Sequence, residues 1–399
     1  MPRDALTSGP RAAPDPGSGG RARSEALHAR VRAFVGASTR GDRAEPFDEL
    51  AIAIARFQAD HVPAIARLGR ARGIDLAEAR AAASIPAVPC DVFRLARVAA
   101  HAPDEDAVIF RTSGTSRGAA ARGEHALRTT ATYELAALAW GERMLWPDGR
   151  RLRAIVIAPP RAEQPDSSLG FMLDLFARRL GGPASFHVRG GADAAIDLDG
   201  LERAAKGARD AGEPAIVLAT SFALVHTIEG RGRRDLRLPE GSRVMQTGGF
   251  KGRSREVAPD ELGRMLVDAF GVAEDHVVGE YGMTELSSQL YEGTLAAALG
   301  HAQGVARRGV YHAPPWVRVT AVDPASLGPV AEGDVGIARI VDLANVDSAV
   351  AIQTADRVRR VAGGIELLGR APGAPPRGCS IAIDEMLGDD RPSARPDGA

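Results

Sequence analysis

Short apolar runs rich in β-branched residues alternate with helical patterns through the middle of the chain. The runs are Ala107–Phe110, Ala154–Ala158, Ala184–Val188, Ala215–Ala219, Arg243–Gln246 and His276–Val278. The helices expected between and after them lie near His125–Leu145, Leu169–Leu180, Leu198–Ala211, Phe222–Ile228 and Pro259–Phe270. This alternation predicts an α/β fold with largely parallel βα layers, in which ligands collect at the carboxyl ends of the strands.

Regions of different character flank this βα core. The Pro/Gly/Ser-rich start has no apolar segment typical of a signal peptide, and an Ala- and Arg-rich stretch with helical spacing follows it. Beyond Gly309 the pattern changes to short strands, and Ser380–Ile383 also looks like a strand. The predicted organisation is a disordered leader (1–21), a helical part (22–84), the βα core (105–308), a β-rich subdomain (309–368), a C-terminal stub (369–389) and a frayed tail (390–399).

Composition excludes several classes of protein. Lys and Arg total 50 against 51 Asp and Glu, so a net charge of −1 gives no field for general nucleic-acid binding. The longest uncharged apolar run, Ala215–Val225, is well short of the roughly 20 residues that a membrane span needs. Two cysteines are too few for a disulfide framework or a cysteine-based zinc site. They suit a reducing compartment, so a cytoplasmic protein is expected.

A loop dense in hydroxyls and glycine follows the first apolar run. It contains Thr112, Ser113, Gly114, Thr115 and Ser116. Hydroxyls and backbone N–H groups in such a loop converge on an anion, and phosphate is the natural guest. The spacing is not that of a P-loop NTPase. The alternative is a polar surface loop.

A second segment, Tyr281-Gly282-Met283-Thr284-Glu285, follows the last apolar run. It offers an aromatic face for a base, a hydroxyl for a phosphate and a carboxylate for Mg²⁺. In the alternative interpretation, Thr284 caps a helix and Tyr281 packs in the core.

Together the two segments resemble the phosphate loop and the adenine motif of the acyl- and aryl-adenylate-forming superfamily. More narrowly, the chain is similar to the acyl-protein synthetase family of bacterial bioluminescence (LuxE-like). The narrower resemblance spans about Phe47 to Leu387. It is carried by Ile85–Pro89 with Phe93, Ser167–Gly170, Thr220–Phe222, Gln246–Gly252, Gly282–Leu286 with Ser288 and Gln289, and Arg377–Ser380.

The resemblance implies ATP-dependent activation of a carboxylic acid, with a fatty acid as the expected substrate, to an acyl-adenylate and pyrophosphate. It makes residues 22–368 one adenylate-forming domain. The implied nucleotide contacts are Thr112, Ser113, Gly114, Thr115 and Ser116 on the β- and γ-phosphates, Gly248, Gly249, Tyr281 and Gly282 at adenine, Thr284 at the α-phosphate and Asp356 at the ribose. Glu285 would hold Mg²⁺, and Arg370 would lie near the nucleotide in a hinge segment. The alternative for Asp356 is a turn acid before a strand.

The chain departs from the superfamily pattern in its lysines. Where the usual phosphate loop continues to Pro-Lys-Gly, this chain reads Arg117-Gly-Ala-Ala-Ala-Arg122, so cationic help must come from arginine. Full-length relatives carry a mobile C-terminal domain with a catalytic lysine, whereas no lysine follows Lys251 here. We therefore expect that domain to be absent or reduced to a stub. Lys251 itself could reach a phosphate or pair with an acid.

Cys379 is the candidate acyl acceptor, because a cysteine near the C-terminus has that role in the bioluminescence enzymes before an acyl reductase receives the group. The neighbouring Arg377 would favour the thiolate. The alternative is a packed, inert thiol, which is the interpretation adopted for Cys90. His125 is expected to begin a helix and face solvent, with orientation of a substrate carboxylate as the alternative.

Three functions follow from these observations. The leading hypothesis is an acyl-protein synthetase that acylates its own Cys379 and serves a partner reductase. One alternative is a coenzyme A ligase of the phenylacetate type, in which CoA takes the acyl group directly. The other is a degenerate nucleotide-binding partner subunit, suggested by Arg117 and the missing lysines.

Overall fold

The computed structural model describes residues 16–112, 122–189, 194–248, 257–301, 306–371 and 377–387. The chain begins with three helices, α1 (Pro16–Arg40), α2 (Phe47–His61) and α3 (Pro63–Ala71), which together are called the helical unit below. Pro63 opens α3 at its first turn, where the missing N–H costs no hydrogen bond. Residues 16–21 are helical, so the leader expected over 1–21 is wrong in its last part. The apolar side chains of α1, among them Val31 and Val35, pack in the main core.

A small hairpin follows the helical unit. After β1 (Val88–Pro89) and α4 (Val92–Leu95), strand β2 (Val108–Arg111) pairs antiparallel with β3 (Glu124–Leu127), and α5 (Ala131–Leu145) comes next. The helix expected from His125 therefore starts later. Pairing with β2 holds the backbone extended and buries His125, Ala126 and Leu127. The first apolar run accordingly belongs to this two-stranded sheet and not to the parallel sheet.

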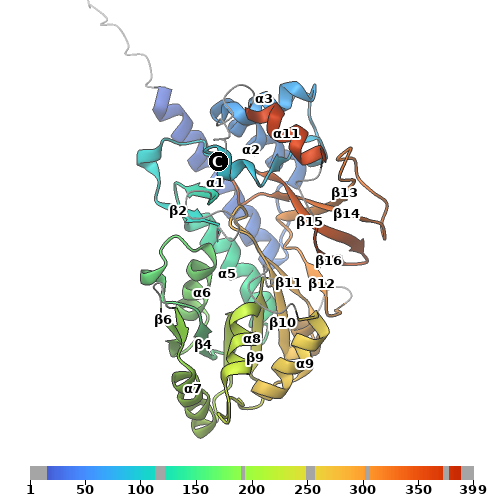
Figure 1. The fold of residues 1–399 in the computed structure, drawn as a ribbon. Coiled ribbons are helices and arrows are strands. Elements are labelled where there is room, and N and C mark those ends of the chain that lie inside the picture. The colour runs from blue at the N-terminus through green and yellow to red at the C-terminus, as the bar shows by residue number, and fades with distance from the viewer. Residues whose placement is uncertain are drawn as a thin grey trace, which may run out of the picture.

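The βα layers are confirmed. Five strands, β5, β4, β8, β9 and β10, lie parallel in that order, with helices between them (Figure 1). The strands are β4 (Arg153–Ile157), β5 (Ala184–Phe186), β8 (Ala215–Thr220), β9 (Arg243–Thr247) and β10 (Val277–Tyr281). The helices are α6 (Ser168–Arg179), α7 (Leu198–Ala211), α8 (Ser221–Gly230) and α9 (Pro259–Phe270), and a minor hairpin joins β6 (Val188–Arg189) to β7 (Ala195–Ile196).

Beyond β10 the sheet continues with antiparallel strands. They are β11 (Leu290–Glu292), β12 (Val310–His312), β13 (Val317–Val322), β14 (Val335–Asp342), β15 (Ala351–Val361) and β16 (Gly364–Arg370), and a short helix, α10 (Thr294–Ala298), follows β11. The full order is β13-β14-β15-β16-β12-β11-β10-β9-β8-β4-β5, and β1 pairs with β15. The predicted β-rich part therefore shares one twelve-stranded sheet with the βα core.

The last described element is a helix, α11 (Arg377–Leu387), where the sequence predicted a strand at Ser380–Ile383. It packs beside α3 at one end of the molecule (Figure 1). Arg67 Nε donates to the Met386 carbonyl at 2.7 Å, and Arg72 Nε to Glu385 Oε2 at 2.7 Å. Packing of Ala382, Ile383 and Met386 against the core fits a helical period, which explains the error.

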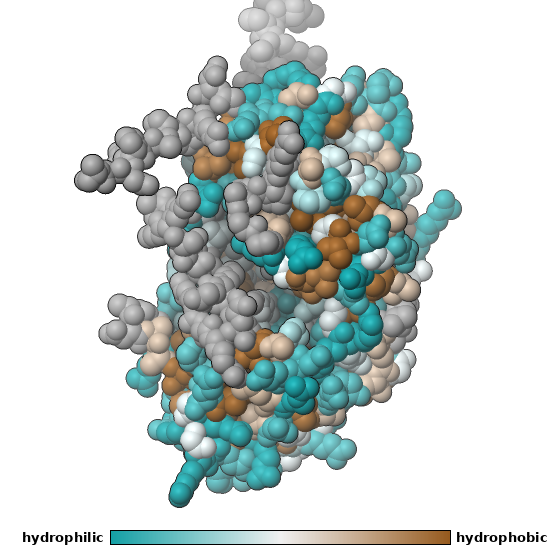
Figure 2. Space-filling model, turned by 45° about the vertical axis from the view of Figure 1, so that its right-hand side comes forward, coloured by the Kyte–Doolittle hydropathy of each residue, from teal (hydrophilic) through white to brown (hydrophobic). Residues whose placement is uncertain are grey.

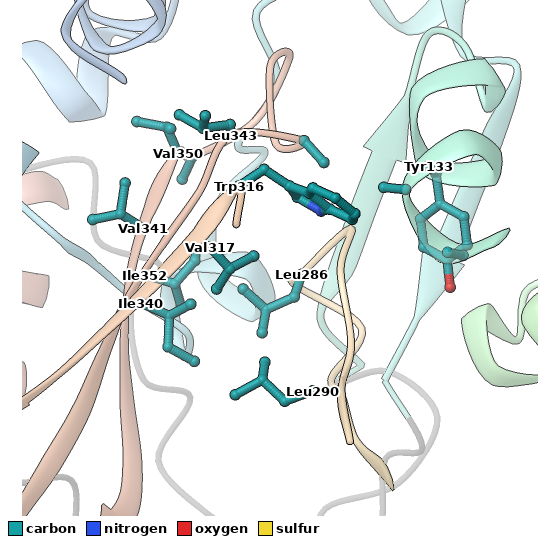
Figure 3. Packing of buried hydrophobic residues seen from close by; sticks show 14 of the residues in the cluster. Tyr133, Leu286, Leu290, Trp316, Val317, Ile340, Val341, Leu343, Val350 and Ile352 are labelled. Atoms are coloured by element: carbon teal, nitrogen blue, oxygen red, sulfur yellow. The ribbon is translucent and has the colours of Figure 1, made fainter. Parts of the chain in front are cut away.

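The main core extends from the helical unit to the antiparallel strands. Figure 3 shows Trp316 and Leu286 among aliphatic side chains of β14 and β15, close to the loop that follows β10. Among the described residues, the exposed large hydrophobic side chains are Val335 and Ile381, and the face in Figure 2 is mostly hydrophilic with separate apolar areas. None of the described helices has the length and apolar character needed to span a membrane.

Candidate active site at the end of strand β10

The described ends of the first predicted nucleotide loop are held as a continuation of the β2–β3 hairpin. Thr112 N donates to the Gly123 carbonyl at 2.9 Å, and Gly123 N donates to Thr112 Oγ1 at 2.8 Å. Arg122 donates to the Thr112 carbonyl at 2.6 Å and to Asp166 Oδ2 at 2.8 Å. Arg122 thus stabilises the base of the loop. The other predicted contacts in this loop, Ser113, Gly114, Thr115 and Ser116, lie outside the described residues.

Three predicted site residues meet at the junction of β10, β15 and β16. The Tyr281 hydroxyl donates to Asp356 Oδ2 at 2.8 Å, and Arg370 Nε lies 3.6 Å from Asp356 Oδ1. Asp356 and Arg370 are direct partners in the β15–β16 register. Burial, together with the Asp356 carboxylate, raises the pKa of Tyr281 well above its usual value, so its hydroxyl stays a donor. The structure therefore joins residues that lie far apart in the sequence.

The segment after Tyr281 is a loop between two paired strands, and we call residues 282–289 the motif loop. Tyr281 pairs with Leu290, so β10 and β11 close the loop at its base. Its second half is anchored in the interior. Ser287 N and Ser288 Oγ donate to Asp342 at 3.0 and 2.8 Å, and Leu286 is 2% exposed. This anchoring gives Thr284 and Glu285 a fixed backbone.

Thr284 and Glu285 are also held by donors from outside the motif loop. His125 Nδ1 lies 2.7 Å from the Thr284 carbonyl, and Asn345 Nδ2 donates to the Glu285 carbonyl at 2.8 Å. His125 is 1% exposed, so its expected solvent-facing role is wrong. Sequence reasoning missed the histidine's role because the helix was extended back over it.

Gly282 lies against the side chain of its neighbour Glu280. A Cβ at position 282 would lie 2.4 Å from Glu280 Oε1, which no real Cβ contact allows. Glu280 is itself buried, and it accepts a hydrogen bond from Thr247 Oγ1. Burial raises the pKa of Glu280 to about 7. The hydrogen bond from Thr247 lowers this pKa, but by less than burial raises it. No motif in the sequence marks this carboxyl group.

Gly248 directly follows β9, next to Thr247. Its φ of +71° is a conformation that favours glycine, and its carbonyl accepts a hydrogen bond from Ser221 Oγ at 2.8 Å. Gly249 and Lys251, the other residues noted in this segment, lie outside the described residues.

The two cysteines lie in different parts of the chain, Cys90 after β1 and Cys379 in α11. Cys90 follows β1, and its N–H donates to the Gln353 carbonyl at 3.0 Å. It is a free, buried thiol whose pKa is raised by burial and by nearby carboxylates, Glu285 first. Cys90 is therefore a poor nucleophile, as the structural interpretation expects. The backbone places Cys379 at the third residue of α11.

The candidate Mg²⁺ ligand, Glu285, is a buried carboxylate next to Thr284. Among the residues that the structure describes, no group of three or more His, Cys, Asp or Glu side chains could hold a metal ion. A single carboxylate still fits Mg²⁺, which in ATP-dependent enzymes is bound by one or two carboxylates, water and substrate phosphates.

Comparison with known proteins adds a family and a fold. The family model described as "Acyl-protein synthetase, LuxE" matches residues 75–388. No curated protein matches the sequence. A solved structure of 2-hydroxyisobutyryl-CoA ligase in an open conformation, in complex with 2-HIB-AMP and CoA, matches with a TM-score of 0.58 and 15% identity, over 81% of this chain and 69% of that chain. The same ligase in its thioesterification state matches with a TM-score of 0.55 and 15% identity, over 88% and 68%. At these identities the likeness shows the fold alone.

Proposed function

Because the chain belongs to the LuxE family of acyl-protein synthetases, we propose that it activates a carboxylic acid with ATP and transfers the acyl group to a protein thiol. In the first step a carboxylate oxygen attacks the α-phosphorus. The new O–P bond forms as the bond from that phosphorus to the bridging oxygen breaks. The products are an acyl-adenylate and pyrophosphate. A fatty acid is the substrate that the family resemblance favours.

The observation that carries this proposal is the meeting of Tyr281, Asp356 and Arg370 beside the motif loop. In the proposed roles, the Tyr281 ring stacks on adenine and Asp356 binds the ribose hydroxyls. Thr284 contacts the α-phosphate, and Thr112 lies at the edge of the loop for the β- and γ-phosphates. Reactions of this kind depend on positioning and charge neutralisation, which oriented donors and a cation supply.

Glu285 is the residue that would hold Mg²⁺ in this proposal. The cation would neutralise charge on the transferred phosphates when bound. The Glu285 backbone is fixed by Asn345, and the residue as a whole is 7% exposed. A buried carboxylate on a fixed backbone suits a cation that accepts few protein ligands.

In the second step, Cys379 is the acyl acceptor. Its sulfur, as the thiolate, attacks the acyl carbonyl carbon, the S–C bond forms, and the bond from carbon to the AMP oxygen breaks. The position of Cys379 in the first turn of α11 supports this role, because the positive end of a helix dipole stabilises a thiolate. The thioester would then pass to a partner acyl reductase.

The adenylation step is tested by ATP–pyrophosphate exchange with a panel of fatty and aromatic acids. We expect exchange that depends on both Mg²⁺ and one class of acid. If no acid supports exchange while the protein binds ATP, the chain is a nucleotide-binding subunit and the proposal is wrong.

The transfer step is tested by labelling with radioactive acid and ATP. We expect a hydroxylamine-sensitive label on the wild-type protein that is lost in Cys379→Ser and retained in Cys90→Ser. Labelling of Cys379→Ser at the wild-type level would overturn the acceptor assignment. AMP formation that requires CoA would instead indicate a CoA ligase.

A further inference from the structure

His125 connects the two segments from which the proposed nucleotide site is built. It lies on β3, two residues after Gly123, in the hairpin that flanks the first loop. Its partner Thr284 is 159 positions further along, in the motif loop. The 2.7 Å contact between His125 Nδ1 and the Thr284 carbonyl therefore joins two parts of the chain that only tertiary structure brings together.

The partners of His125 fix its tautomer. A carbonyl oxygen can only accept, so Nδ1 must carry the proton and donate it. The other ring nitrogen, Nε2, lies 2.9 Å from Ser348 Oγ and therefore accepts from that hydroxyl. Burial lowers the pKa of His125 to about 4, so the ring is neutral near pH 7 and can accept at Nε2. Both ring nitrogens are thus satisfied in one orientation.

The surroundings leave the ring little freedom. The Phe93 ring lies edge-on to it, with 5.7 Å between the ring centroids. Ser348 is fully buried, and the preceding residue, Asp347, accepts a 2.8 Å hydrogen bond from His28 of α1. Gln58 of α2 donates to the carbonyls of Asn345 and Val346 at 2.7 and 2.8 Å. The helical unit therefore fixes the segment that orients His125.

Other contacts to the motif loop act on different residues. Asp342 accepts from Ser287 and Ser288, and Asn345 donates to Glu285. His125 is the described side chain that holds Thr284 itself, and it does so from the hairpin of the other nucleotide segment. Loss of this donor would leave a carbonyl without its partner beside the proposed α-phosphate contact.

We propose that His125 is a positioning residue for adenylation, whose Nδ1–H fixes the Thr284 carbonyl and sets the motif loop against the β2–β3 hairpin. This inference rests on the proposed function and assigns it a further residue. His125 acts through Thr284 and transfers no proton.

The test uses two substitutions that each keep one ring nitrogen's function. The amide nitrogen of His125→Asn takes the place of Nδ1 and still donates to Thr284. His125→Gln places its amide near Nε2, where it keeps the Ser348 contact and loses the Thr284 donor. We expect the KM for ATP in pyrophosphate exchange to rise about tenfold in His125→Gln, because the loss of one hydrogen bond has a cost of that order. His125→Asn should stay within about threefold of wild type.

Two further variants separate positioning from a general structural effect. Ser348→Ala removes the Nε2 partner and should change the KM for ATP less than His125→Gln does. His187, which is also buried and bonds to Ser185 at 2.8 Å, provides the control: His187→Gln should leave the KM unchanged. Melting temperatures of all variants are measured in parallel.

Equal KM values for His125→Asn and His125→Gln, at equal melting temperatures, would overturn the proposal. If His125→Gln does not fold, a tenfold rise in KM for a folded His125→Asn would overturn it as well. If the wild-type protein supports no exchange, calorimetric binding of Mg–ATP to the same variants gives the readout. A failure of the proposed function is then distinct from a failure of the role assigned to His125.

Discussion

Two buried carboxyl groups, Asp347 and Glu280, show opposite responses to the same environment. Each is nearly inaccessible to water, with 3% and 5% exposure. Burial alone would raise both pKa values. For Asp347, however, hydrogen bonds from His28 and Ser24 and the charge of Arg128 bring the pKa below its ordinary value. For Glu280 one hydroxyl donor is present, and burial raises the pKa to about 7.

The difference between the two pKa values indicates what each carboxyl group is suited to do. Asp347 is a charged anchor at which α1 meets the core through Ser24 and His28. Glu280 is a group that can change its protonation near neutral pH, and its carboxyl group lies close to Gly282 of the motif loop. Buried carboxylates with strong partners serve stability, whereas those with few partners remain titratable.

The largest expected effect is the loss of the charged anchor. Asp347→Asn removes the charge that pairs with Arg128 and the carboxylate that His28 contacts, and a broken buried ion pair costs about 3 kcal/mol or more. We expect a loss of that size in the free energy of unfolding, measured by urea denaturation at pH 7. The matched control is Asp210→Asn, because Asp210 pairs with Lys206 at the surface with 62% side-chain exposure. Equal losses of unfolding free energy in Asp347→Asn and Asp210→Asn would show that Asp347 is not a stabilising anchor.

The second prediction concerns pH and Glu280. The folded protein holds a proton up to about pH 7, whereas the unfolded chain releases it near its ordinary pKa of 4.5. The stability of wild type relative to Glu280→Gln should therefore be highest below pH 4.5, fall as the pH rises to about 7, and level off above it. The fall should be on the order of 3 kcal/mol.

This prediction is measured by urea denaturation of both proteins between pH 4 and pH 9. Glu213→Gln serves as the control, because Glu213 is largely exposed and its ion pair with Arg153 is at the surface. A constant difference between wild type and Glu280→Gln over the whole range would show that Glu280 titrates normally.

The smallest expected effects come from removing one hydroxyl donor from the partners of each carboxyl group, Asp347 and Glu280. Ser24→Ala deletes a donor to the ionised Asp347, and we expect a loss of about 1.5–3 kcal/mol, as for hydrogen bonds to charged groups. Thr247→Val deletes the donor to Glu280 and should cost less than that below pH 7, where the carboxyl is neutral. Thermal unfolding at pH 6 compares the two. The comparison fails if Thr247→Val is the more destabilised variant.

The parts of the fold that were predicted well carry their own local signals. Helix α7 begins after Asp197, which accepts from Gly200 N at 2.8 Å, and ends at Gly212 with φ +63°. Helix α9 starts at Pro259 and ends at Gly271 with φ +65°. Caps of this kind are short-range, so the sequence reveals them directly.

The errors occur where distant contacts decide the structure. Strand β3 is extended because β2 pairs with it, and α11 is helical where its packing on α3 suits a helical period. The meeting of Tyr281, Asp356 and Arg370 followed from family resemblance, not from spacing. The bond from His125 to Thr284 has no counterpart in any local pattern, because both partners take their positions from the tertiary fold.

The closure of the motif loop between β10 and β11 has a consequence for the affinity of its ligand. Pairing of Tyr281 with Leu290 and the bonds to Asp342 order these residues when the protein folds. The loss of backbone freedom, about 1–2 kcal/mol per residue, is then part of the folding equilibrium and is absent from the binding equilibrium. A nucleotide at this loop would meet groups that are already in place, so little of its binding energy would be needed for ordering the loop.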